Sequence, residues 1–174
     1  MNEREEVFVT NNFEETRKLG EEFVARLHLE QGVTLSKATV IALYGDLGSG
    51  KTTFVQGMAK GLGIKRRIIS PTFIIIRSYN IKYPHFAEAS RGWQISNIKY
   101  TNKKLKMFYH IDLYRIESEK DVKGLGIKEI LKDPQNIVVI EWAEKMGNLL
   151  PKNRINIYFE YLGYDMRRIT IKNS

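Results

Sequence analysis

Apolar side chains recur along this chain at spacings that change from one segment to the next. The short run from Val7 to Val9 predicts a strand. Between about Asn12 and Leu29 apolar positions return every three or four residues, which predicts an amphipathic helix with Asn12 as its N-cap. The inward face of this helix would consist of Phe13, Thr16, Leu19, Phe23 and Leu27.

The middle of the chain carries continuous apolar runs. Residues 39–44 are apolar and rich in β-branched side chains, which predicts a strand buried on both faces. A glycine-rich turn follows at once, and Lys51 to Leu62 then predicts a helix that Gly63 closes. Two later runs, Met107 to Leu113 and Ile137 to Ile140, predict further buried strands.

The remaining segments predict shorter elements. Residues 118–131 predict one helix, with Ser118 and Asp121 in capping-box spacing. Residues 155–161 and 168–172 alternate as an antiparallel hairpin turned by residues 163–165. Ser70-Pro71-Thr72 forms a rigid turn before a β-rich run at 73–76. Residues 79–106 are polar, aromatic and basic, and we interpret them as a basic insertion.

Composition narrows the class of protein. The chain has 174 residues, of which 43% are hydrophobic and 28% charged, which suits one globular domain over residues 1–174. It has no cysteine, which excludes disulfides and thiolate metal sites. The charged N-terminus lacks the apolar core of a secretory signal, and no apolar run is long enough to span a bilayer. We therefore expect a cytoplasmic protein without a membrane partner.

The positive charge is concentrated in one part of the sequence. The net charge is +8, and residues 60–107 contain eleven Lys or Arg against one acid, Glu88. Such an excess attracts phosphate backbones, which makes a nucleic acid a candidate contact. A solvated basic surface explains the same charges equally well.

One motif carries the chemistry, and it matches G-x-x-x-x-G-K-[ST]: Gly45-Asp46-Leu47-Gly48-Ser49-Gly50-Lys51-Thr52. Its glycines permit a loop whose amides surround phosphates at a helix N-terminus. Lys51 adds a point charge for the β- and γ-phosphates, and the Thr52 hydroxyl is a hard ligand for Mg²⁺. The motif predicts that these residues, together with Thr53, bind a nucleoside triphosphate and Mg²⁺.

Two predicted strands end in a carboxylate, Asp112 and Glu141. Ligands of open α/β sheets gather at the carboxyl ends of strands, so one acid would hold the metal and the other would orient the attacking water. Trp142 either stacks on the base or fills the core, and Thr72 either senses the γ-phosphate or only forms its turn. We interpret His110 as a structural, hydrogen-bonded histidine.

Several classes of P-loop protein remain. A GTPase is disfavoured, because the nearest match to N-K-x-D is Asn102-Lys103-Lys104-Leu105, which lacks the aspartate. A small-molecule kinase remains open, with residues 79–106 as a lid. A nucleotide-gated module that binds RNA or protein is a further alternative. The predicted fold is α/β: a P-loop NTPase-like domain with a mostly parallel central sheet, helices on both faces and a C-terminal antiparallel hairpin.

Four ordered segments together resemble a known family: GDLGSGKTTFVQGMAKGLG, SPTF, HIDLYR and VIEWAEKMGNLLP. From about Thr16 to Pro151 the chain is similar to the TsaE family, the ATPases of bacterial tRNA threonylcarbamoyladenosine biosynthesis. The resemblance implies an ATPase that acts with the threonylcarbamoyl transferase and its paralogous partner subunit. These proteins modify the adenosine next to the anticodon of tRNA, and ATP hydrolysis supports repeated cycles. The resemblance thereby implies tRNA as the candidate contact of the basic range 60–107.

The resemblance also implies site residues. Asp112 corresponds to the family's essential Walker-B-like acid, and Glu141 to its second acid at the Mg²⁺ site, with Trp142 beside it. Thr72 corresponds to the threonine of a switch-like turn. The chain departs from the family in its longer segment 79–106 and in Ala143, where a proline is common. We assign no counterpart to an arginine that the family often places near the nucleotide, although Arg167 and Arg168 are close to the expected place.

Overall fold

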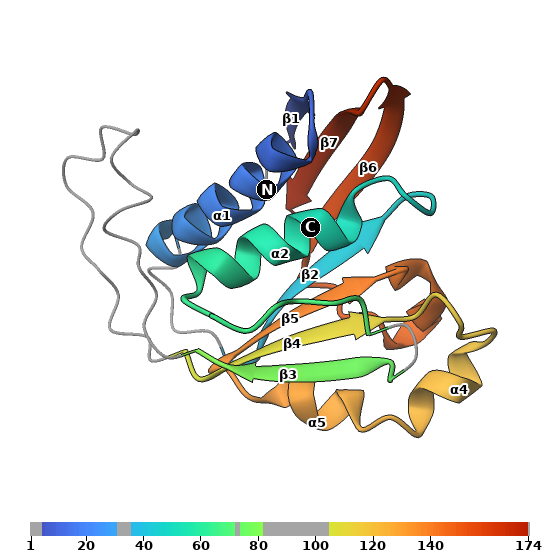
Figure 1. Ribbon diagram of the computed structural model, residues 1–174. Coiled ribbons are helices and arrows are strands. Elements are labelled where there is room, and N and C mark those ends of the chain that lie inside the picture. Colours follow the sequence, from blue (N-terminus) through green and yellow to red (C-terminus); the bar gives the residue numbers. More distant parts are fainter. Residues whose placement is uncertain (1–4, 31–35, 72–73, 82–104, 174) are drawn as a thin grey trace.

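The chain folds around one mixed sheet, which the computed structural model describes over residues 5–30, 36–71, 74–81 and 105–173. Among these residues seven strands lie in the order β1-β7-β6-β2-β5-β4-β3 (Figure 1). Their bounds are β1 Glu5–Thr10, β2 Thr39–Tyr44, β3 Ile76–Asn80, β4 Met107–Asp112, β5 Asn136–Glu141, β6 Ile155–Gly163 and β7 Met166–Asn173. The helices are α1 Phe13–Glu30, α2 Lys51–Gly61, α4 Glu119–Lys123, α5 Ile127–Lys132 and the 3-10 helix η2 Ala143–Leu149.

The central strands are parallel and the outer ones are antiparallel. β6, β2, β5 and β4 run in the same direction, so β2, β4 and β5 end at the same edge. β3 is antiparallel to β4, and β6, β7 and β1 continue the sheet in antiparallel pairs on the other side. The predicted α/β class, with a parallel centre and a C-terminal hairpin, is confirmed.

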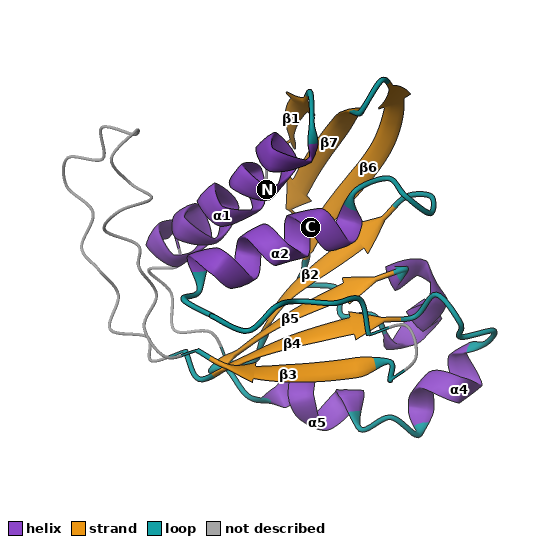
Figure 2. Cartoon of the chain, viewed as in Figure 1, coloured by secondary structure: helices purple, strands orange, loops and turns teal. Residues whose placement is uncertain are grey.

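Helices cover both faces of the sheet, as predicted (Figure 2). α1 and α2 pack on one face, where Phe23 and Phe54 approach to 5.5 Å between ring centroids. α4, α5 and η2 lie on the other face, over β2, β4 and β5. β5 is buried along its whole length and β2 along all but its last residue, which explains their uninterrupted apolar sequences.

The predicted helix at residues 12–29 is confirmed, with one error on its inward face. Asn12 caps it, since its side-chain oxygen accepts a hydrogen bond from the Glu15 amide at 2.8 Å. Phe13 is 51% exposed and lies under the Arg17 guanidinium rather than in the core. Thr16 is buried, as predicted, with its hydroxyl 2.8 Å from that of Thr10.

Two other predictions need correction. Residues 118–131 contain two short helices and not one, because α4 ends at Lys123 with Gly124 as its C-cap, and Gly126, with a φ of 68°, is the N-cap of α5. The capping box is present, since the Asp121 carboxylate accepts from the Ser118 amide at 3.0 Å. β3 begins only at Ile76, because Ile75 has a φ of 68° and both Ile74 and Ile75 donate to the Pro71 carbonyl.

The basic insertion connects β3 to β4. It begins two residues later than predicted, because residues 79 and 80 belong to β3. The Ile81 amide donates to the Lys106 carbonyl at 2.9 Å, which brings the two ends of the connection together. Residues 82–104 lie outside the described residues.

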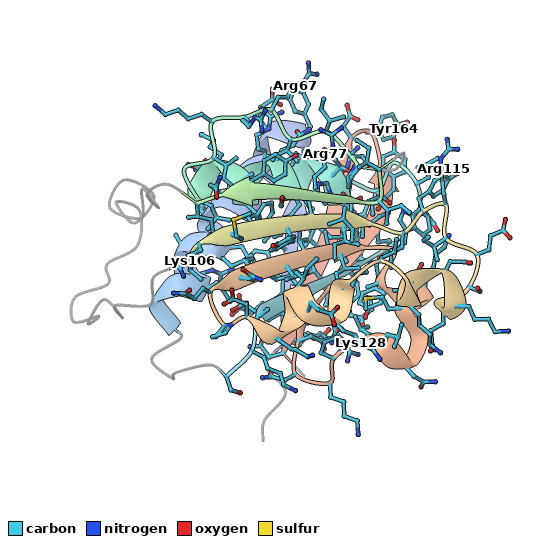
Figure 3. All side chains as sticks on the ribbon, turned by 90° about the horizontal axis from the view of Figure 1, so that it is seen from below. Arg67, Arg77, Lys106, Arg115, Lys128 and Tyr164 are labelled. Carbon is cyan, nitrogen blue, oxygen red and sulfur yellow. The ribbon has the colours of Figure 1, made fainter. Side chains whose placement is uncertain are left out.

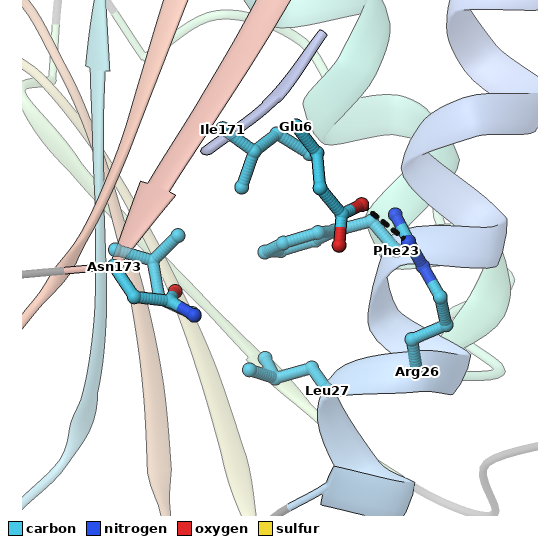
Figure 4. A pocket seen from close by; sticks show the side chains of 7 residues that line it. Glu6, Phe23, Arg26, Leu27, Ile171 and Asn173 are labelled. Carbon is cyan, nitrogen blue, oxygen red and sulfur yellow. Dashed lines mark hydrogen bonds and ion pairs between the residues drawn. The ribbon is translucent and has the colours of Figure 1, made fainter. Parts of the chain in front are cut away.

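A small cavity lies between α1 and the β1–β7 edge, closed on one side by an ion pair of 2.7 Å between Arg26 and Glu6 (Figure 4). Its volume of about 40 Å³ accommodates water but no nucleotide. The other lining residues are Phe23, Leu27, Ile155, Ile171 and Asn173. No helix in the described part of the chain is long and apolar enough to cross a membrane.

Two glycines let α1 and α2 approach each other closely. A Cβ at Gly57 would lie 1.9 Å from the Arg17 carbonyl oxygen, and one at Gly20 would lie 2.2 Å from that of Phe54. These neighbours are backbone atoms, so relief requires the helices to separate. Since α2 begins in the P-loop, the packing of α2 on α1 also holds that loop in place against the sheet.

We therefore expect Gly57→Ala to lower the free energy of unfolding by about 2–3 kcal/mol, through overpacking of the α1–α2 contact. Urea denaturation followed by circular dichroism measures this change. Gly124→Ala is the matched control, because its Cβ would meet no atom within 4 Å and its φ of −82° suits alanine. Equal effects of the two substitutions would contradict the explanation.

Candidate nucleotide-binding site

The glycine-rich loop leaves the carboxyl end of β2 and turns directly into α2. Gly45 has a φ of 131°, and a Cβ there would lie 2.3 Å from the Phe159 carbonyl oxygen, so only glycine fits. Gly48 and Gly50 also have positive φ values, 79° and 103°. Gly50 is the N-cap residue of α2, which leaves the amides of the first turn directed at the loop. This is the backbone arrangement that anion binding requires.

Lys51 lies over the loop as the first residue of α2. Its ammonium donates to the carbonyl oxygens of Gly45 at 2.6 Å and Asp46 at 2.8 Å, and it lies 4.2 Å from the centre of the Trp142 ring. Burial lowers the pKa of the Lys51 ammonium, and the negative charge of Glu141 opposes that shift. The cation is thus held inside the loop by neutral oxygens and an indole.

Thr52 connects the loop to the acid at the end of β5. Its hydroxyl lies 2.9 Å and 3.0 Å from the two Glu141 carboxylate oxygens, as a bifurcated donor. A hydroxyl beside a carboxylate is the kind of oxygen pair that Mg²⁺ prefers. No group of three His, Cys, Asp or Glu side chains that could hold a metal occurs among the described residues. An Mg²⁺ ion here would therefore also need oxygens from water and phosphate, as it commonly does.

Asp112 lies next to Glu141 on the neighbouring strand. The two residues are paired in the β4–β5 ladder, and each is only 3% exposed. The Asp112 carboxylate accepts from the Tyr114 amide at 2.9 Å and from the Ser70 hydroxyl. Both predicted acids therefore end parallel strands at one edge of the sheet, beside the glycine loop.

The glycine loop, the first turn of α2 and the ends of β4 and β5 enclose a cleft of about 320 Å³. Most of the predicted site residues line it, while Gly45, Asp46 and Ser49 build the loop beneath. Trp142 lines the cleft and also packs against the core, and its stacking on the base stays a prediction. The lining residues are Leu47, Gly48, Gly50, Lys51, Thr52, Thr53, Ser70, Asp112, Tyr114, Glu141, Trp142 and Arg167. Thr72 lies outside the described residues, so its assignment stays a prediction.

Arg167 lines the cleft together with Ser70 and Tyr114, although the sequence assigned none of the three to the site. Arg167 stands at the start of β7, and its Nε lies 3.5 Å from the position of a Cβ on Gly50. Its guanidinium donates to the Asp165 carbonyl, which fixes the side chain beside the loop. The sequence signal was an arginine just after a hairpin turn. Only the packing of the hairpin shows that this turn reaches the glycine loop.

Among the described residues, the basic side chains of the 60–107 range come from several different elements (Figure 3). Arg67 follows α2 and Arg77 lies on β3, and both appear on the same side in this view. Lys106 lies at the far end of β4, where that strand begins. Lys60 is engaged by Glu21 at 2.8 Å. The predicted tRNA contact of this range remains a prediction.

Comparisons with known proteins agree on one family. The family model described as "Threonylcarbamoyl adenosine biosynthesis protein TsaE" matches residues 10–89 and 89–169. The tRNA threonylcarbamoyladenosine biosynthesis protein TsaE of Bacillus subtilis is 37% identical over 131 residues, covering 75% of this chain and 67% of that protein. The protein of the same name from Rickettsia bellii is 33% identical and covers 95% of this chain and 94% of its own length.

A solved structure is similar in fold as well. The crystal structure of Bacillus subtilis YdiB superposes with a TM-score of 0.66 at 27% sequence identity. The superposition covers 99% of this chain and 88% of the other. The similarity thus extends over the whole sheet and is not confined to the glycine loop.

Proposed function

This chain belongs to the TsaE family of threonylcarbamoyl adenosine biosynthesis proteins, and we propose that it serves tRNA threonylcarbamoylation as an Mg²⁺-dependent ATPase. The observation that carries the proposal is the contact of the Thr52 hydroxyl with both oxygens of Glu141, next to the buried Lys51 ammonium. A P-loop hydroxyl, an acid from a neighbouring strand and a lysine are the parts that phosphoryl transfer to water requires.

Different residues of the chain would bind the phosphates, hold Mg²⁺ and activate the attacking water. The amides of the loop and of the first turn of α2 bind the phosphates, and Lys51 contributes its charge to the β- and γ-phosphates. Thr52 and Glu141 would hold Mg²⁺, which when bound neutralises charge on the phosphate oxygens. Asp112 accepts a proton from the attacking water or orients it, because its carboxylate is fixed by Ser70 and the Tyr114 amide.

Three further residues complete the cleft. Trp142 offers an aromatic face for the nucleotide. Arg167 places a second cation beside Gly50, where charge develops on the transferred phosphoryl group. Thr72 follows Ser70 by two positions, which suits contact with the γ-phosphate.

The proposed partners are the threonylcarbamoyl transferase and its paralogous partner subunit. The modified group is the adenosine next to the anticodon, and ATP hydrolysis in this chain supports repeated cycles of the transferase. Surface cations of the 60–107 range are available for contact with tRNA.

Multiple-turnover threonylcarbamoylation of tRNA tests the proposal. The partner proteins are assayed with and without this chain, with ATP or with a non-hydrolysable analogue. We expect more than one product per transferase only when the chain and hydrolysable ATP are both present. Equal turnover without the chain would contradict the assigned role. Transfer of label from ATP to a small molecule would favour a kinase instead.

A further inference from the structure

His110 lies inside the protein, on the same face of the sheet as the two acids. It is fully buried on β4, two residues before Asp112, so the two side chains project from one face. Its Nε2 lies 2.7 Å from Oε1 of Glu141. The imidazole therefore contacts the Glu141 carboxylate from β4, while Thr52 contacts the same carboxylate from α2.

The surroundings of the two ring nitrogens of His110 indicate which of them carries the proton. Nδ1 is buried and has no hydrogen-bond partner in the described part of the chain. A buried N–H without an acceptor is rarer than an unused acceptor, so the proton belongs on Nε2, where a carboxylate receives it. His110 thus donates Nε2–H to Glu141 Oε1.

Packing alone gives no reason for an imidazole here. The neighbouring positions Phe108, Ile111 and Val139 are buried apolar side chains. A buried ring with one unpaired nitrogen is less favourable than an apolar side chain of similar size. The compensating interaction of His110 is its bond to Glu141.

The same bond restricts the Glu141 carboxylate. Among the described residues, the hydrogen bonds to this carboxylate come from Thr52 and His110. A hydroxyl that ligates a metal turns a lone pair toward the ion and has one proton to donate, so Thr52 alone does not hold both oxygens of Glu141. The His110 bond to Oε1 does not depend on how the Thr52 hydroxyl is turned.

We propose that His110 is a positioning residue, whose Nε2–H holds the Glu141 carboxylate in the orientation in which Glu141 and Thr52 together receive Mg²⁺. This inference rests on the proposed function, since it takes Thr52 and Glu141 as the residues that hold the ion. It goes beyond that function because it attributes part of the Mg²⁺ affinity to His110, a residue that does not touch the ion.

Three variants test the role: His110→Gln, His110→Asn and His110→Leu. Glutamine can place its amide N–H near the position of Nε2, whereas asparagine reaches only the position of Nδ1 and leucine donates nothing. Mn²⁺ binding to the protein–ADP complex is measured by electron paramagnetic resonance. We expect the leucine and asparagine variants to bind Mn²⁺ about tenfold or more weakly, and glutamine to restore most of the affinity.

Two further measurements separate positioning from folding. Affinity for a fluorescent ADP in EDTA is expected to be equal in all four proteins, because His110 does not contact the nucleotide cleft. Ring nitrogen shifts of His110 in the unaltered protein, measured by NMR, are expected to show Nε2 protonated and Nδ1 bare. A protonated Nδ1 would overturn the inference even if every variant failed to fold.

The other outcomes are distinguishable. If folded variants all bind Mn²⁺ like the unaltered protein, or if glutamine is no better than asparagine, the positioning role is wrong and the proposed function stands. If the unaltered protein with ADP binds no Mn²⁺, the proposed metal site itself is wrong, and the inference fails with it.

Discussion

Replacing Lys51 by alanine is expected to abolish ATP turnover, with a loss in kcat of about 10²–10³-fold or more. The Lys51 ammonium is buried within the loop, 2.6 Å from the Gly45 carbonyl oxygen and 2.8 Å from that of Asp46. Phosphate oxygens offer it a stronger, charged acceptor than these carbonyls. ATP hydrolysis with the partner proteins, and multiple-turnover threonylcarbamoylation, measure the effect.

A matched control is available on the same helix. Lys60 is in the last turn of α2, its side chain is 67% exposed, and it pairs with Glu21 rather than with the loop. Lys60→Ala removes the same charge and is expected to keep kcat within about twofold, as surface substitutions usually do. Retained ATPase activity in Lys51→Ala would contradict the proposed site.

Loss of activity in Lys51→Ala should not reflect loss of folding. Burial lowers the pKa of Lys51, so the folded state binds its proton less readily than the unfolded chain does. The charge therefore opposes folding in full at pH values below the lowered pKa, and this cost falls as pH rises through it and vanishes above the pKa of the unfolded chain. We expect the melting temperature of the variant at neutral pH to stay within about 5 °C of the original.

Much of the site could be predicted from the sequence because its parts are local. The β2 strand, the glycine loop and α2 are contiguous, and their backbone requirements are visible as glycines and as a change of hydrophobic period. The two acids could be placed at one sheet edge because each ends a buried strand. Such arguments need only the direction of parallel strands.

The parts that the sequence did not predict depend on distant contacts. Arg167 and Gly50 are far apart in the chain and meet only because the C-terminal hairpin packs beside β2. His110 was interpreted as structural, since nothing in the alternation of β4 indicates that its ring faces Glu141 across the ladder. Ser70 joins Asp112 for the same reason, through a loop that crosses the strand ends.

Two errors in secondary structure came from single backbone angles. Residues 118–131 were predicted as one helix, but they contain Gly124 and Gly126, and the φ of 68° at Gly126 separates α5 from α4. Ile75 takes a similar angle of 68°, which a β-branched side chain disfavours, so its residue type does not indicate it. The error at Phe13 concerns burial: this residue suited the helical period but is 51% exposed, under the Arg17 guanidinium.

Substitution of the two acids is expected to have large effects of different kinds, which would assign the roles that the sequence left open. We expect Glu141→Gln to raise the Mg²⁺ concentration for half-maximal ATPase activity about tenfold or more, because Glu141 is the acid that contacts the Thr52 hydroxyl. We expect Asp112→Asn to lower kcat about 10²-fold or more at saturating Mg²⁺, with nucleotide affinity retained. Steady-state ATPase activity across a magnesium titration measures both.

Glu144→Gln controls for the loss of one negative charge near the cleft. Glu144 is exposed at the start of η2, and its charge acts on Lys51 as those of Glu141 and Asp112 do. We expect this control to change neither the magnesium dependence nor kcat by more than about twofold. A similar effect of all three substitutions would mean that overall charge, and not position, determines activity.

The two acids have different hydrogen-bond partners, so the roles assigned to them predict different effects of substitution, and experiment can contradict the assignment. Both acids are 3% exposed and adjacent in the ladder, so burial and charge do not distinguish them. Their hydrogen bonds do, since Glu141 receives the P-loop hydroxyl whereas Asp112 receives Ser70 and a backbone amide. If Asp112→Asn instead shifted the magnesium dependence while Glu141→Gln lowered only kcat, Asp112 would be the metal ligand. The Thr52–Glu141 contact would then belong to a resting arrangement that the nucleotide replaces.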